Sequence, residues 1–103
     1  MTSFYKALED LVRDSDDFNG YIEKTSSLLS GEFGVSVTFC EIFGKRWSFI
    51  TGDGLFPAGT ARRETFEAGG RQFGLLAYPD PGITFPWDRL KPLLIRGFSS
   101  ILS

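Results

Sequence analysis

The chain has 103 residues, which is enough for one domain over residues 1–103 and too few for two. A hydrophobic content of 42% and a charged content of 23% are typical of globular proteins. The net charge of −2 argues against a nucleic-acid interface, which needs a basic surface. No apolar run approaches the roughly 18–20 residues that span a bilayer, and the acidic N-terminus is unlike a signal peptide. We therefore expect a cytoplasmic protein without a membrane partner.

Two amphipathic helices are predicted in the N-terminal third of the chain. Apolar residues at helical spacing predict the first over residues 3–14. The acidic cluster at residues 14–17 interrupts it and offers an N-cap for a second helix over residues 17–30. Gly34 is one of the glycines that mark the exit from this helix.

The apolar pattern then changes to a period of two, which predicts four strands in two hairpins. The strands are residues 34–43 and 46–51 around a Gly44-Lys45 turn, and residues 61–68 and 71–78 around a Gly69-Gly70 turn. Centring the first turn in this way pairs Cys40 with Phe49. It also pairs Ile42 with Trp47, so that all four side chains share one face of the sheet.

The second hairpin joins two strands of different character. Residues 61–68 alternate charged with other side chains, which predicts an edge strand protected against aggregation. Residues 71–78 are far more apolar and predict an inner strand. The turn pairs Phe66 with Phe73, and Pro79 ends the second strand because proline cannot donate to a ladder.

A last amphipathic helix is predicted from about Pro86 to Ser103. Pro92 conflicts with it, because a proline inside a helix costs about 3 kcal/mol. We expect either a short turn over residues 86–91 with the main helix starting near Pro92, or a kink. The element order α-α-β-β-β-β-α then predicts an α+β fold: a four-stranded antiparallel sheet, strand order 2-1-4-3, with N- and C-terminal helices packed on one face.

Two stretches of the chain resemble a GAF domain, within the broader GAF/PAS-like architecture. EAGGRQFGLLAYPDPGITFPWDRLKPLLIRGFSSIL is similar to the closing part of that family, through Phe73-Gly74-Leu75-Leu76 followed by Phe85, Asp88 and Leu90. SLLSGEFGVSVTFCEIFGKRW is similar to the family's opening helix and first hairpin. The short loop at residues 52–60 departs from the longer middle that roofs the ligand pocket in GAF domains. The resemblance implies small-ligand sensing and dimeric signalling, and no family binding residue carries over.

The side chains offer little for catalysis, so we expect no enzyme, no cofactor and no metal site. Histidine is absent, which removes the commonest general base and metal ligand. Cys40 is the single cysteine, and a zinc site needs about four ligands. Glu41 and Glu64 could act as an acid–base pair, but each could equally meet an arginine.

Two surfaces are candidates for binding. The sheet face away from the helices could form a shallow pocket for a small molecule, or its side chains could instead be core or dimer contacts. Both faces of the first hairpin are apolar, so the sequence does not decide which of them lies away from the helices. The pocket residues would be Cys40, Ile42, Trp47 and Phe49, closed over by Leu55 and Phe56. The terminal helices could form a homodimer through Leu8, Leu11, Leu94, Phe98 and Ile101.

The function predicted from these features is that of a non-enzymatic GAF-like sensory, regulatory or dimerisation module in a signalling protein of the bacterial type. The alternative is a small acidic protein-binding dimer similar to secretion chaperones, which are also short, acidic α/β proteins that hold an extended partner.

Overall fold

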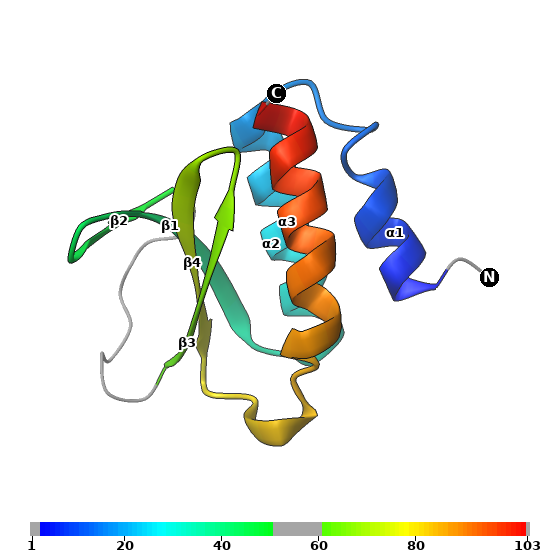
Figure 1. Cartoon of the computed structure of the whole chain (residues 1–103). Helices are drawn as coiled ribbons and strands as arrows, with labels where there is room; N and C mark the ends of the chain where they lie inside the picture. The colour runs from blue at the N-terminus through cyan, green and yellow to red at the C-terminus, as the bar shows by residue number, and fades with distance from the viewer. Residues whose placement is uncertain (1–2, 51–60, 103) are drawn as a thin grey trace.

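The computed structural model describes residues 3–50 and 61–102, and it is an α+β fold (Figure 1). The elements in chain order are α1 (Phe4–Asp10), α2 (Phe18–Phe33), β1 (Ser36–Phe43), β2 (Arg46–Phe49), β3 (Arg62–Ala68), β4 (Arg71–Tyr78), the 3₁₀ turn η1 (Gly82–Thr84) and α3 (Trp87–Leu102). The strands form one antiparallel sheet in the order β2-β1-β4-β3. The predicted fold class and strand order are therefore confirmed.

Side-chain caps set the start of both N-terminal helices. The Ser3 hydroxyl accepts a hydrogen bond from the Lys6 N–H at 3.1 Å, and the Asp17 carboxylate accepts one from the Gly20 N–H at 2.8 Å. At the other end of α2, Gly34 adopts a left-handed φ of 66° and donates its N–H to the carbonyl of Ser30. Glycine suits this conformation because it has no Cβ to clash.

The helix ends differ from the sequence prediction. α1 stops at Asp10 rather than at residue 14, because the N–H groups of Arg13 and Asp14 both bond to the Asp10 carbonyl and close a turn. α2 continues past the predicted end at residue 30 to Phe33. The Phe33 ring packs edge-on against the Phe85 ring at 5.0 Å, and this contact favours the extra turn.

The two hairpins have the predicted registers. Cys40 lies opposite Phe49 in the β1–β2 pair, with Ile42 opposite Trp47. In the β3–β4 pair, the predicted partners Phe66 and Phe73 face each other. Both turns use the positive φ that glycine allows: 65° at Gly44, and 59° and 76° at Gly69 and Gly70. Because the turns fix the register, they also decide which side chains share a face.

α3 runs without interruption from Trp87 to Leu102, so the predicted separate start near Pro92 is wrong. Pro92 is exposed, which places its missing hydrogen bond where water can replace it. The opposite side of the helix buries Leu90, Leu94 and Phe98 completely. Burying such a side chain contributes about 1.5–3 kcal/mol, so three of them outweigh the roughly 3 kcal/mol cost of an internal proline.

All three helices lie on one side of the sheet: α2 and α3 cover it, and α1 packs on the side of these helices away from the sheet (Figure 1). The apolar core joins buried residues of the strands and the helices. Phe98 of α3 stands at its centre, with no exposed surface. Its ring centroid lies 4.8 Å from that of Phe66, 4.9 Å from Phe73 and 5.5 Å from Phe39. Strands β1, β3 and β4 therefore all contact one aromatic ring of the C-terminal helix.

Candidate functional site

The sheet face away from the helices carries the four described residues of the predicted pocket. Strand alternation directs Val37 and Phe39 of β1 into the core beneath the helices. Cys40 and Ile42 therefore point to the opposite side, together with their partners Trp47 and Phe49. The sequence could not decide which hairpin face meets the helices, and the structure assigns these four residues to the helix-free face. The predicted closing residues Leu55 and Phe56 lie outside the described residues.

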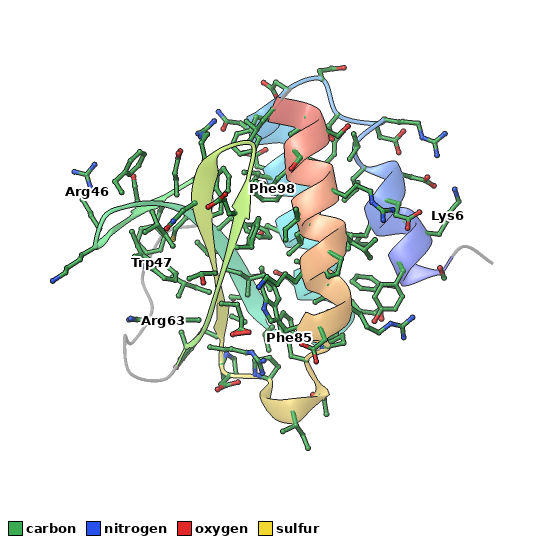
Figure 2. The ribbon with its side chains drawn as sticks, viewed as in Figure 1. Lys6, Arg46, Trp47, Arg63, Phe85 and Phe98 are labelled. Carbon is green, nitrogen blue, oxygen red and sulfur yellow. The ribbon has the colours of Figure 1, made fainter. Side chains whose placement is uncertain are left out.

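Trp47 covers the middle of this face. Its indole reaches from the edge strand β2 across β1 to Gly74 of β4. A Cβ built on Gly74 would lie 2.7 Å from Cη2 and 2.8 Å from Cε3 of the ring. The Arg63 guanidinium approaches from the other edge, 5.9 Å from the Trp47 ring centroid, and both side chains extend away from the helices (Figure 2). Gly74 is thus the position that lets the indole rest on the backbone.

The surface around Trp47 is apolar and unevenly exposed. Thr38, Cys40 and Leu76 are buried beneath it, although they point away from the helices. Phe49, at the margin, is 45% exposed. Burial raises the pKa of the Cys40 thiol to about 11, so this cysteine stays a neutral thiol near pH 7. Its environment matches a packed small side chain rather than an activated nucleophile.

The carboxylates considered for acid–base chemistry are both paired with arginines. Arg71 Nε donates to Glu41 Oε2 at 2.7 Å, and a second bond joins Nη2 to Oε1. This hydrogen bonding holds the pKa of Glu41 below its usual value. Glu64 lies 3.5 Å from the Arg62 guanidinium. Each carboxylate therefore has an arginine partner within the fold.

The residues predicted for a dimer interface divide into two groups. Leu8, Leu94 and Phe98 are buried within the chain, so they are unavailable to a partner surface. Leu11 and Ile101 are half-buried and flank the core. A contact between copies through the helices would therefore use their outer side rather than the centre of the apolar stripe.

Two features are absent from the part of the chain that the structure describes. No group of three or more His, Cys, Asp or Glu side chains there is placed to hold a metal ion. No helix among these residues has both the length and the apolar character needed to cross a membrane.

No family model matches this chain, and no curated protein or solved structure matches it either. The resemblance to GAF domains therefore stays a prediction.

Sequence reasoning missed the role of two residues at this site, Gly74 and Arg63. In the sequence, Gly74 stands out only as the glycine of the GAF-like stretch Phe73-Gly74-Leu75-Leu76. Its contact with an indole two strands away leaves no local sequence pattern. Arg63 lies in the charged edge strand over residues 61–68, whose charges were interpreted only as protection against aggregation. Alternation places Arg63 on the strand face opposite to Phe66, and the pairing of β1 with β4 makes this the face that carries Trp47.

Proposed function

We propose that this chain is a non-enzymatic GAF-like regulatory module of a signalling protein of the bacterial type, which binds a small apolar molecule on its helix-free sheet face. The observation that supports this proposal is the position of Trp47, flat against Gly74 and beside Ile42 and Phe49. Planar molecules stack well on such rings, and small-molecule sites are mostly apolar with a few polar groups at the margin. Arg63 supplies the polar group here.

In this proposal, ligand binding on the sheet face changes the helices through contacts in the core. Strand β1 presents Cys40 to the ligand side and Phe39 to the helix side, where the Phe39 ring meets Phe98 at 5.5 Å. A ligand that shifts β1 therefore also shifts α3. We further propose that the outer helix surface, with Leu11 and Ile101 at its margins, joins two copies into a homodimer.

Fluorescence of Trp47 tests the ligand proposal directly. The chain has two tryptophans, so Trp87→Phe leaves Trp47 as the only reporter, and Trp47→Phe is the matched control. Cyclic nucleotides, tetrapyrroles and aromatic metabolites are screened for an increase in melting temperature. A site occupied at 100 times its dissociation constant stabilises a protein by about 2.7 kcal/mol. A true ligand should also change Trp47 emission and lose affinity in the Trp47→Phe variant. Stabilising compounds that leave both unchanged would contradict the proposed site.

Sedimentation velocity tests the dimer separately. We expect a dimer at high micromolar concentration and its dissociation in Leu11→Glu, which places a charge on the outer helix surface. The matched control is Gln72→Glu, which adds the same charge at an exposed position on strand β4. A strict monomer at this concentration would refute the dimer and leave the ligand proposal intact.

A second candidate function is protein binding of the secretion-chaperone kind, and the exposed rings of the first hairpin favour it. Phe43 at the end of β1 is 52% exposed. Phe49 is 45% exposed on β2, a short edge strand with which an extended partner could pair. Co-expression with a secreted protein encoded beside this chain tests this function. Co-purification that is lost in Phe43→Ser would support it, and co-purification unaffected by that change would count against it.

A further inference from the structure

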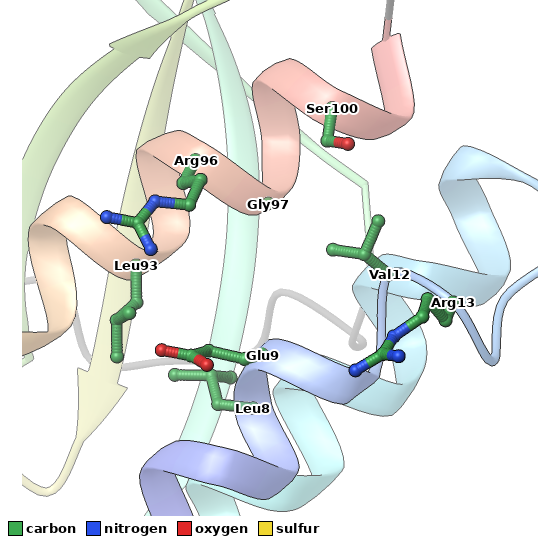
Figure 3. Close-up of a pocket in the computed structure, with 8 residues that line it drawn as sticks. All are labelled: Leu8, Glu9, Val12, Arg13, Leu93, Arg96, Gly97 and Ser100. Atoms are coloured by element: carbon green, nitrogen blue, oxygen red, sulfur yellow. The ribbon is translucent and has the colours of Figure 1, made fainter.

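A groove lies between α1 and α3, on the helix layer and separate from the proposed sheet site (Figure 3). Its volume is about 290 Å³, near the lower end of the roughly 300–1,000 Å³ typical of small-molecule sites. Leu8, Val12 and Leu93 supply apolar side chains to it. Such a space suits a molecule with a short apolar group rather than a nucleotide or a large cofactor.

Two opposite charges stand on the two walls of this groove. Glu9 belongs to α1 and Arg96 to α3, and Figure 3 shows both side chains extended toward the space between the helices. Neither forms an ion pair within 4.0 Å among residues 3–50 and 61–102. The other arginine of the groove, Arg13, is already bonded to Asp10 at 2.9 Å. The groove thus offers one carboxylate and one guanidinium without a charged partner.

We propose that this groove binds a free α-amino acid with an apolar side chain. The ligand ammonium would bond to the Glu9 carboxylate and the ligand carboxylate to the Arg96 guanidinium, a charge-assisted pair with planar complementarity. The ligand side chain would then lie on Val12 and Leu93. A zwitterion satisfies both walls at once, whereas a simple anion or cation leaves one of the two charges unpaired.

Heteronuclear NMR of the full chain titrated with leucine tests this proposal. We expect amide shifts at Glu9, Val12 and Leu93, with little change on the sheet. Two analogues serve as ligand controls: 4-methylpentanoate lacks the ammonium, and 3-methylbutylamine lacks the carboxylate. Each should bind about tenfold more weakly than leucine, because hydrogen bonds to charged groups are the stronger ones.

Substitutions provide the matching protein controls. Glu9→Gln and Arg96→Gln should each weaken leucine binding about tenfold. Lys91→Gln should leave it unchanged, since Lys91 is an exposed cation of the same helix outside the groove. All three positions are exposed, so the variants should fold, and circular dichroism checks this.

Three results would overturn the proposal: no shifts at saturating leucine, equal binding of leucine and both analogues, or shifts confined to β1, β2 and β4. The last result would place leucine at the proposed sheet site instead. Conversely, loss of ligand binding in Trp47→Phe with unchanged leucine binding would separate the two sites, because Trp47 lies on the other side of the sheet.

Discussion

Replacing Gly74 with alanine is the sharpest test of the candidate sheet site, because it adds one methyl group at the point where Trp47 rests. The added Cβ would lie 2.7 Å from Cη2 and 2.8 Å from Cε3 of the indole. Carbon atoms in contact normally rest about 3.5–4.0 Å apart, so the ring must move outward by about 1 Å or swing away from β4.

The cost of displacing the indole sets the expected change in the free energy of unfolding. Forcing an extra methyl group into a packed site costs about 1–3 kcal/mol. Without the indole the sign should reverse, because glycine inside a strand is about 0.5–1 kcal/mol less favourable than alanine. We therefore expect Gly74→Ala to destabilise the parent chain by about 1–3 kcal/mol and to be neutral or stabilising in the Trp47→Ala background.

Urea unfolding of the parent chain, the two single variants and the double variant measures the effect of Gly74→Ala with and without the indole. The Trp87→Phe background isolates the fluorescence of Trp47, which should shift to longer wavelength when Gly74→Ala moves the ring toward water. Equal destabilisation in both backgrounds would show that the cost arises from the strand and not from the indole. A stabilising effect with Trp47 present would refute the contact itself.

The remaining predictions concern the core, the helix and two titratable groups. Phe98→Ala should lower the free energy of unfolding by about 3–5 kcal/mol, because it removes a fully buried ring; a loss below about 1 kcal/mol in urea would contradict its central position. Pro92→Ala should raise the melting temperature, since it relieves a helix cost of about 3 kcal/mol and forfeits only about 0.4–1 kcal/mol of unfolded-state restriction; calorimetry showing a lower value would refute this. The bond from Arg71 lowers the pKa of Glu41 from 4.5 in the folded state, so its stabilisation is complete above pH 4.5 and lost as the pH falls through the lowered value. The Glu41→Gln variant should therefore lose less stability than the parent chain as the pH falls. The same pH dependence in both proteins would argue against a stabilising Glu41–Arg71 ion pair. Cys40, with its pKa raised to about 11 by burial, should react with a disulfide reagent at pH 8 only after unfolding, so rapid reaction of the folded chain would contradict its burial.

The sheet was predictable because its information is local. Each hairpin has a glycine turn that permits positive φ, and a turn fixes the register of every pair beyond it. The start of α2 was predictable for the same reason, since Asp17 caps a helix whose first turn directly follows it. These features follow from a few neighbouring residues and do not depend on the rest of the fold.

The helix ends and the continuity of α3 depended on contacts that no local pattern contains. Phe33 lengthens α2 because it meets Phe85, which lies far along the chain. α3 tolerates Pro92 because the proline faces water while Leu90 and Leu94 enter the core. At the end of α2 and at Pro92 of α3, the burial of apolar side chains outweighed local helix propensity.

The orientation of the first hairpin shows the same limit at the candidate site. Both of its faces are apolar, so alternation identified Cys40 and Trp47 as neighbours without deciding which side they occupy. Phe98 decides it, because its ring needs Phe39 on the helix side and thereby turns Cys40 outward. The residue that orients the proposed ligand face thus belongs to the helix that bears one wall of the proposed amino-acid groove.

Packed aromatic rings connect the candidate sheet site to helix α3. Gly74 is flanked in β4 by Phe73, whose ring lies 4.9 Å from that of Phe98. One turn earlier on the same helix, Leu94 is buried in the core, while Arg96 between them faces the groove. The contact of Phe73 with Phe98 therefore joins β4 to the helix that also carries Arg96. The two proposed sites thus share one helix, and any coupling between their ligands would have to be reciprocal by linkage.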